Sequence, residues 1–393
     1  MLELFWLLLP VAACSGWIAG SKNKLKITKG KHPKDSTLNQ QYIKGLNLIL
    51  NEQTDKAVDV FINLFSVDDE TVETHLALGS LFRRRGEVER ALRIHQNVIA
   101  RPNLCPQQRL NGMLELGYDY LFAGVLDRAE NIFNDILKQY PNNTVALGYL
   151  LDIYQQQRDW QAAINIALLL NKHSFGNNPN KYTKNIIQYY CELTSSAIEK
   201  CDYNNAIAYN RQALKIQDNN IRANLMLAEL CLVDNQTDKG LNIYLNIARL
   251  HRNYLDIILP LLITAHVKHS DKTDDLLDFI EKLIVSAPQV LIIKDVVNLL
   301  VEHKGHEEAF NLIADAAVTT PRLRIMSNLL ELIGERGFKS IDYYNKICEG
   351  LQKLLSDQKN YNCNNCGFTC RELLWLCPSC KNWDTINNLD FVD

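Results

Sequence analysis

The chain has 393 residues, 47% of them hydrophobic, which is enough to bury a core in one elongated array or in several domains. Its 42 Lys and Arg nearly balance its 45 Asp and Glu, and the net charge of −3 argues against a nucleic-acid-binding protein, which would carry a basic excess. Only 17 Gly and 10 Pro are present, a composition that disfavours an all-β fold and suits long helices.

An uncharged apolar segment covers residues 4–20. With the two residues before it, the stretch is roughly 19 residues long, and at ~1.5 Å per residue such a helix just crosses a ~30 Å hydrocarbon core. Trp6 and Trp17 lie towards its two ends, where interfacial aromatic side chains are favoured. The sequence therefore predicts a transmembrane anchor over residues 1–20.

Two other interpretations of this segment are a cleaved signal peptide and a lipoprotein signal ending at Cys14. Both require basic residues before the apolar run, and none is present. Six lysines instead follow the run, in a basic linker over residues 21–37: Lys22, Lys24, Lys26, Lys29, Lys31 and Lys34. The positive-inside rule then predicts a single-pass protein whose bulk lies on the cytoplasmic side.

A helical repeat follows over residues 38–360. The tetratricopeptide pattern has a small residue at position 8, a large one at position 11, Ala at position 20 and an apolar residue at position 24. Position 20 is filled by Ala57, Ala91, Ala129, Ala163, Ala206 and Gly240. Six residues define five spacings along the chain, and three of these spacings equal the 34-residue repeat length. The sequence therefore resembles a tetratricopeptide array.

The other repeat positions agree with this register. Position 8 holds Gly45, Gly79, Gly117 and Ala228; position 11 holds Leu48, Phe82, Tyr120 and Tyr154; position 24 holds Phe61, Phe133 and Tyr244. Beyond about residue 250 the pattern weakens. Leu276 and Ile280 match positions 20 and 24 poorly, and Ala309 and Pro321 match position 20 and the proline expected near position 32. A helical pair is expected over 323–358. The predicted fold class is all-α, a tetratricopeptide-repeat solenoid that is degenerate after about residue 250.

Such arrays bind partners along the concave face formed by the first helix of each repeat. Arg83 and Arg84 occupy positions 12 and 13 of the second repeat, which face that groove in this repeat family. They are candidate groove residues for an acidic partner segment. The alternative is an ordinary solvated charged face.

Five of the eleven cysteines fall in the C-terminal segment, residues 361–393. Cys363 and Cys366 form one C-x2-C pair, and Cys377 and Cys380 form a second, the spacing of two knuckles that share one tetrahedral metal. Zinc in a structural role is favoured, although the same cysteine motif also matches rubredoxin, which binds iron. Cys370 is expected to be a bystander.

Aromatic residues around this rubredoxin-like knuckle are expected to pack it onto the last helices: Tyr361, Phe368, Trp375 and Trp383. The scattered cysteines are expected to be small buried hydrophobes in a reducing compartment: Cys14, Cys105, Cys191, Cys201, Cys231 and Cys348.

Together these segments resemble the lipopolysaccharide assembly protein B family of Gram-negative bacteria. The likeness rests on MLELFWLLLPVAA, DKAVDVF, LGSLFRRRGEVERALRIHQ, LDRAENIF, YCEL and CGF…WLCPSC, and it is weakest over about 250–345. The resemblance implies an adaptor on the cytoplasmic face of the inner membrane. Such adaptors promote degradation of the lipid A-pathway deacetylase by the membrane AAA+ protease FtsH and associate with other inner-membrane lipopolysaccharide regulators and assembly proteins.

Two other functions stay open: a rubredoxin-like electron-transfer protein, and a general assembly scaffold without a proteolytic role. An enzyme is disfavoured, because the sequence holds no glycine-rich phosphate loop and no HExxH motif, and its nine His are dispersed. No catalytic residue is therefore predicted. No nucleic-acid partner is expected, and a homo-oligomer is left open.

Overall fold

A computed structural model describes, apart from a few isolated residues, the ranges 72–173, 181–269, 273–319, 322–335 and 358–390. The predicted anchor, the basic linker and most of the first repeat lie outside these ranges. Within them, no helix combines the length and the apolar character needed to cross a bilayer. The chain divides into two compact units, residues 1–149 and residues 150–393, called here unit 1 and unit 2.

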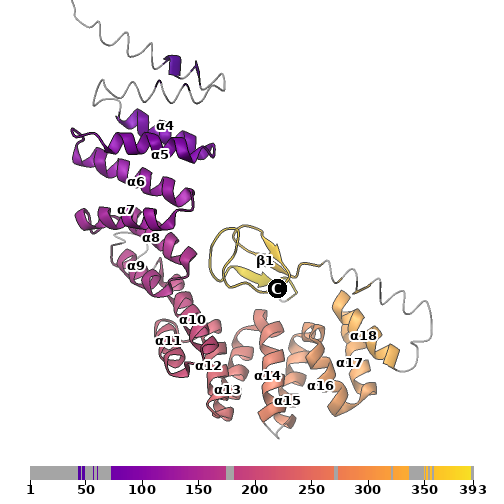
Figure 1. Cartoon of the computed structure of the whole chain (residues 1–393). Coiled ribbons are helices and arrows are strands. Elements are labelled where there is room, and N and C mark those ends of the chain that lie inside the picture. The colour runs from indigo at the N-terminus through magenta and orange to yellow at the C-terminus, as the bar shows by residue number, and fades with distance from the viewer. Residues whose placement is uncertain are drawn as a thin grey trace, which may run out of the picture. The chain divides into compact units, whose positions relative to one another are not determined.

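Unit 1 consists of helices that pair in chain order (Figure 1). Its described elements are α4 (Val72–Arg84), α5 (Val88–Ile99), α6 (Pro106–Phe122) and α7 (Leu126–Gln139), and α8 (Thr144–Gln157) spans the boundary to unit 2. The second helices α5 and α7 are strongly amphipathic, so one face of each is buried against its neighbours.

Unit 2 continues the helix pairs and ends in a small sheet (Figure 1). Its helices are α9 (Trp160–His173), α10 (Thr183–Glu199), α11 (Tyr203–Ile216), α12 (Ile221–Val233), α13 (Thr237–Leu250), η2 (Arg252–Tyr254), α14 (Leu255–His269), α15 (Thr273–Ser286), η3 (Pro288–Ile292), α16 (Lys294–Lys304), α17 (His306–Thr319) and α18 (Leu323–Glu335). Three short strands follow, β1 (Tyr361–Cys363), β2 (Thr369–Cys370) and β3 (Ile386–Asn388), in an antiparallel sheet of order β2-β1-β3.

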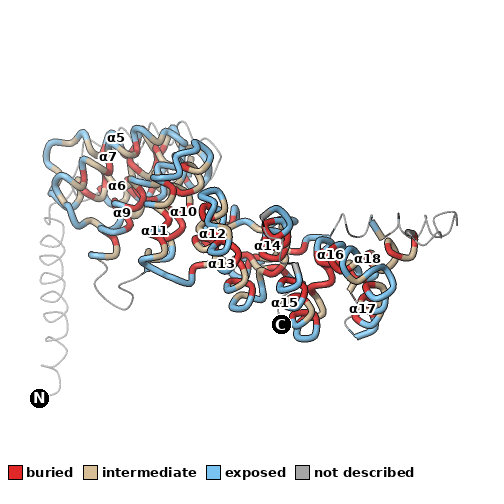
Figure 2. Tube along the Cα trace, turned by 90° about the horizontal axis from the view of Figure 1, so that it is seen from below, coloured by how far each residue is buried: buried red, intermediate tan, exposed pale blue. Residues whose placement is uncertain are grey.

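The helices pack as the repeat register predicts. The position-20 alanines of four repeats are fully buried: Ala91, Ala129, Ala163 and Ala206. Figure 2 shows stretches of buried residues within the helices of both units. Where the sequence pattern weakens, Leu276, Ile280 and Ala309 are still buried, and α14 to α17 still form helix pairs. The tetratricopeptide solenoid is therefore confirmed. Of the helical pair expected over 323–358, α18 is the part that the structure describes.

A left-handed residue ends the first helix of each described pair up to α12. These residues are Gly86 (φ 85°), Gly124 (φ 74°), Arg158 (φ 58°), Cys201 (φ 57°) and Asn235 (φ 58°). The N–H of the following residue returns to a carbonyl in the last turn of the helix at 2.8–2.9 Å in all five cases, which satisfies a helix end that would otherwise be unpaired. Each lies five positions before a position-20 residue, as Gly86 does before Ala91, so this turn keeps the repeat register even where glycine is absent.

Positions 8 and 24 of a repeat touch across the helix pair. A Cβ added to Gly117 would lie 2.7 Å from the ring of Phe133, and one added to Gly79 would lie 2.3 Å from the ring of His95. Both rings belong to fully buried side chains. The glycines are therefore required by the close approach of the first helix to a large side chain on the second.

Replacing Gly117 by Ala is expected to lower the free energy of unfolding by about 1–2 kcal/mol, because overpacking against Phe133 outweighs the better helix propensity of Ala. Gly148 is the matched control: it is also helical, but nothing lies within 4 Å of its added Cβ. Gly148→Ala should raise stability by up to about 1 kcal/mol. Urea unfolding followed by circular dichroism measures both, and equal effects of the two variants would contradict the close approach.

Candidate metal centre

Four cysteine sulfurs gather between the two C-x2-C segments of the small sheet. The Sγ atoms of Cys363, Cys366, Cys377 and Cys380 all lie within 4.8 Å of one another. Cys363 and Cys380 are 3.8 Å apart, and Cys366 and Cys377 are 3.7 Å apart. The two cysteine pairs therefore face each other as a single four-sulfur cluster.

The spacing of these sulfurs fits one tetrahedral ion. With metal–sulfur bonds of ~2.3 Å, neighbouring sulfurs lie about 3.8 Å apart, because the edge of a tetrahedron is about 1.63 times its centre-to-vertex distance. The sulfur–sulfur distances of 3.8 Å and 3.7 Å agree with that value. The four cysteines thus form a metal-binding knuckle for one ion, and this geometry is compatible with either zinc or iron.

The two knuckles share one backbone design. Gly367, directly after Cys366, has φ 74°, and Lys381, directly after Cys380, has φ 57°. In each knuckle the N–H of that residue bonds to the carbonyl of the first cysteine, at 2.9 Å and 3.0 Å. Glycine adopts this conformation readily at position 367, whereas at position 381 a lysine adopts it without that freedom.

Hydrogen bonds prepare part of this site for thiolates. The pKa of Cys363 is lowered to about 6, first by the Thr385 hydroxyl 3.2 Å away, and then by the backbone N–H groups of its own knuckle. The pKa of Cys380 is also lowered, first by the Asn365 side chain. Burial instead raises the pKa of Cys377 to about 11, and the charge of a bound cation would favour its thiolate.

The fifth cysteine stands apart from the four ligands. Cys370 lies in β2, half-buried against the core of the knuckle, and burial raises its thiol pKa. The scattered cysteines differ in their burial. Cys191 and Cys231 are buried as expected, whereas Cys105 and Cys201 are exposed. The Cys105 sulfur caps the first turn of α6 instead. Cys14 and Cys348 lie outside the described residues.

Two tryptophans attach the metal knuckle to the helices of unit 2. Trp375 stacks on Tyr254, with ring centroids 6.1 Å apart and an angle of 10° between the planes. Trp383 is 7% exposed and meets the ring of Tyr189 edge-on at 6.1 Å and that of Trp160 at 6.3 Å. Aromatic pairs of this geometry contribute about 0.5–1.5 kcal/mol each beyond the area they bury.

A buried polar chain joins the same surfaces. Gln188 donates from Nε2 to both oxygens of Asp384, at 2.9 Å and 2.8 Å, and its own oxygen accepts from Arg222 at 3.0 Å. The Arg222 guanidinium also pairs with Glu192 at 2.8 Å and lies 5.6 Å above the ring of Trp375. Burial raises the pKa of the Asp384 carboxyl, while the bonds from Gln188 act in the opposite direction.

A second polar contact lies at the other end of the knuckle. Asp256, in the first turn of α14, accepts from the hydroxyl of Tyr361 and, at 2.7 Å, from Asn388. Asp390 pairs with Arg322 at 3.0 Å, directly before α18. The knuckle therefore contacts first helices of successive repeats on one face of unit 2, called here the inner face.

The expected packing of the knuckle onto the last helices is therefore wrong for most of its contacts. Trp375 and Trp383 lie against α9, α10, α12 and η2, Tyr361 lies against α14, and Phe368 packs within the knuckle itself. The chain returns to repeats that precede the knuckle by many residues. Local sequence pattern carries no information about such a return.

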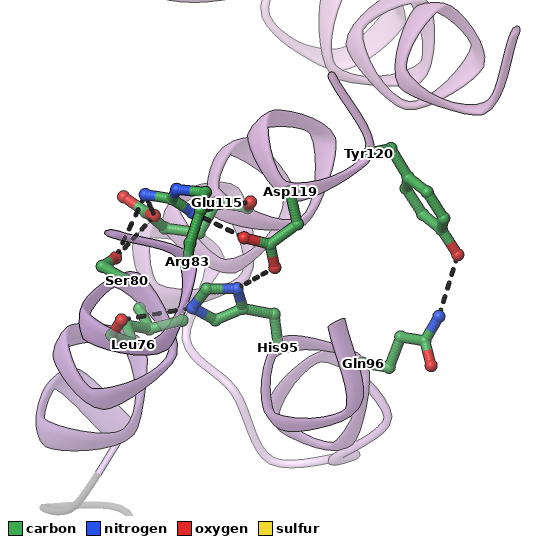
Figure 3. Close-up of polar contacts among 8 residues, drawn as sticks. All are labelled: Leu76, Ser80, Arg83, His95, Gln96, Glu115, Asp119 and Tyr120. Atoms are coloured by element: carbon green, nitrogen blue, oxygen red, sulfur yellow. Dashed lines mark hydrogen bonds and ion pairs between the residues drawn. The ribbon is translucent and has the colours of Figure 1, made fainter. Parts of the chain in front are cut away.

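Arg83 and Arg84, the predicted groove residues, have different environments. Arg83 is 5% exposed, and its guanidinium donates to Asp119 at 2.6 Å and to Glu115 at 2.8 Å (Figure 3). The ring of Tyr118 lies 4.3 Å from the guanidinium carbon. Binding of a partner carboxylate by Arg83 would require this internal ion pair to open. Arg84 is exposed, and its role in binding stays a prediction.

The same cluster contains a residue that the repeat pattern did not predict. His95 takes position 24, where other repeats carry Phe133 or Tyr244, and it is fully buried. Its Nδ1 faces Asp119 and its Nε2 lies 3.2 Å from the carbonyl oxygen of Leu76 (Figure 3). A His in place of an aromatic residue was the available signal that this repeat has a polar core.

Comparisons with known proteins agree with both parts of this architecture. Residues 361–388 match the family model of the rubredoxin metal binding domain, and residues 74–107 match that of the tetratricopeptide repeat. The chain is 31% identical over 399 residues to lipopolysaccharide assembly protein B of Escherichia coli K12, covering 100% of both chains. It is 32% identical over 409 residues to the protein of the same name from Haemophilus influenzae, covering 98% of each.

Solved structures resemble it more remotely. A tetratricopeptide repeat protein from Parabacteroides merdae is 15% identical, with a TM-score of 0.33, and covers 67% of this chain and 99% of its own. The C-terminal part of a repeat-containing protein from Cytophaga hutchinsonii is 19% identical, with a TM-score of 0.33, and covers 50% and 73%.

Proposed function

The chain belongs to the lipopolysaccharide assembly protein B family, and on that premise we propose that it is a non-enzymatic adaptor that restrains lipopolysaccharide synthesis. In this proposal it presents the lipid A-pathway deacetylase to the membrane protease FtsH. The observation that carries the proposal is the identity of 31% over the whole of both chains, which includes the repeats and the metal knuckle together.

The architecture supports an adaptor rather than a catalyst. Helical repeats expose long surfaces on which a partner can be held, and the relatives are named for assembly. The predicted anchor over residues 1–20 would place the adaptor in the same membrane as the protease, with the bulk on the cytoplasmic side. Sharing a membrane raises the effective concentration of two weakly binding partners.

We propose zinc as the resident metal, in a structural role. The knuckle packs against the repeats through Trp375 and Trp383, so its metal stabilises a docked surface. Elemental analysis of the purified chain tests this assignment: one zinc per chain and no visible absorbance supports it. Stoichiometric iron with thiolate-to-iron absorbance bands would instead support an electron-transfer function.

The adaptor proposal makes a direct prediction about the lifetime of the deacetylase. Depleting this chain should lengthen that lifetime several-fold, because the protease then receives less of its substrate. The lifetime is followed by immunoblot after translation is stopped. In cells already deprived of FtsH activity, depletion should add nothing further.

Two results would count against this role. If depletion changes lipopolysaccharide content while the deacetylase lifetime stays constant, the chain acts as an assembly scaffold without a proteolytic role. If the lifetime lengthens equally with and without FtsH activity, another protease is involved.

A further inference from the structure

A hollow lies on the inner face of unit 2, beside the metal knuckle. Its volume is about 770 Å³, within the ~300–1,000 Å³ of sites that hold a drug-sized ligand. The side chains that line it come mainly from α12 and α14, and the loop between the two knuckles contributes Leu373 and Trp375. The groove is thus built jointly by the repeats and the metal knuckle.

The lining of this groove is mostly apolar and partly open to solvent. Leu225, Met226 and Leu232 from α12 line it together with Leu261 from α14. Leu261 is 43% exposed, and Leu374, next to the lining residue Leu373, is 38% exposed. Apolar side chains that gather around a hollow are typical of an interaction site, whereas singly exposed ones are not.

Two charges in the groove lack internal partners. Lys268 on α14 and Glu229 on α12 are both exposed, and neither forms an ion pair with any described residue. Arg222, by contrast, is occupied by Gln188 and Glu192. Lys268 is therefore the basic group of this groove that is available to a carboxylate of a partner.

The knuckle itself shows what chemistry the inner face accepts. Its Trp383 and Asp384 are adjacent in sequence: the indole enters a cluster with Tyr189, and the carboxylate accepts two bonds from Gln188. An aromatic side chain beside a carboxylate is thus bound by α10 within this molecule. The groove continues the same face from Trp375 towards Lys268.

We propose that the groove between α12, α14 and the loop 371–376 is a docking site for a partner protein segment that carries large apolar side chains beside a carboxylate. The apolar side chains fill the hollow, and the carboxylate pairs with Lys268. The proposal deepens the adaptor role and rests on it. It also makes the knuckle a wall of the binding site, so that a partner contacts repeats and knuckle together.

Fluorescent synthetic peptides test this proposal on the purified full-length chain. One twelve-residue peptide carries Leu and Trp next to Asp; a second replaces Asp by Lys; a third replaces Leu and Trp by Ser. Fluorescence anisotropy should show saturable binding of the first peptide, at least five-fold weaker binding of the second, and none of the third.

Two variants locate the binding. Leu261→Arg should weaken the first peptide at least ten-fold, and Lys268→Glu should remove or reverse the preference for Asp over Lys. Val318→Ser is the matched control, because Val318 is 84% exposed on α17, away from the groove residues, and should leave binding within two-fold. Circular dichroism establishes whether each variant is folded. If Leu261→Arg does not fold, Lys268→Glu still tests the proposal.

Other results would overturn the proposal: no saturable binding of the first peptide, a preference for the Lys peptide in the unmodified chain, or affinities unchanged by both groove variants. Binding of the serine peptide as tightly as the first would also exclude an apolar anchor. These outcomes are distinct from failure of the adaptor role. Deacetylase lifetime can depend on the chain even if this groove binds nothing.

Discussion

Replacing Cys363 or Cys377 by Ser is expected to remove the metal almost completely while most of the helix signal remains. Each cysteine supplies one of four sulfurs in a cluster whose spacing fits a single ion, and loss of one thiolate opens the coordination shell. Structural zinc contributes roughly 10–16 kcal/mol of apparent binding free energy in small finger peptides, so the knuckle has no comparable source of stability without it. The helices are stabilised by their neighbours and should persist.

Three measurements check this prediction. Zinc content should fall from one per chain towards zero, circular dichroism should stay near that of the unmodified chain, and tryptophan fluorescence should shift to longer wavelength as Trp375 and Trp383 leave the inner face. Cys370→Ser is the control, because its sulfur is outside the cluster and metal content should be retained. Loss of most of the helix signal would instead mean that the repeats depend on the docked knuckle.

Replacing Asp119 by Ala is expected to destabilise unit 1 by about 3–5 kcal/mol, the loss typical when one member of a buried ionic cluster is removed. Asp119 is completely buried and accepts from Arg83 on one oxygen and from His95 on the other. The two nitrogens of His95 face the Asp119 carboxylate and the Leu76 carbonyl, so the ring is held between two helices by polar contacts. Without Asp119, two buried donors lose their carboxylate together.

Asp135→Ala is the matched control in the same unit. Asp135 also forms an ion pair, with Lys138 at 2.8 Å, but its side chain is 55% exposed. The change should therefore alter stability by less than about 1 kcal/mol. Urea unfolding of both variants provides the comparison, and a loss for Asp119→Ala no larger than that for Asp135→Ala would show that the cluster contributes little.

The sequence contained the repeat register and the metal ligands because both are local. Position 20 needs a small side chain at a helix crossing, so Ala91 and Ala129 mark the repeats directly, and two C-x2-C pairs specify a four-sulfur site. The polar core around His95 was not predicted, because a single polar residue in an amphipathic helix is ordinarily expected on the surface. Its partner Asp119 comes from the following helix α6, and Arg83, which pairs with Asp119, comes from the preceding helix α4.

The contacts between the knuckle and the repeats could not be predicted from the sequence, for a different reason. Gln188 and Asp384 are 196 residues apart, and neither residue type indicates a buried contact. Trp375 and Trp383 signal that something apolar is covered, without saying by which helix. The left-handed turns at Arg158 and Cys201 could not be predicted either, since Arg and Cys seldom adopt that conformation.

The same separation of 196 residues has a kinetic consequence. Each helix pair makes its contacts within a few dozen residues, so the repeats can form progressively as the chain leaves the ribosome. The bond from Gln188 to Asp384 joins residues 196 positions apart, so it cannot form until the end of the chain is available. This contact must wait until the knuckle has been synthesised and has acquired its metal. During biogenesis the inner face of unit 2 is therefore uncovered for as long as metal delivery lags behind translation.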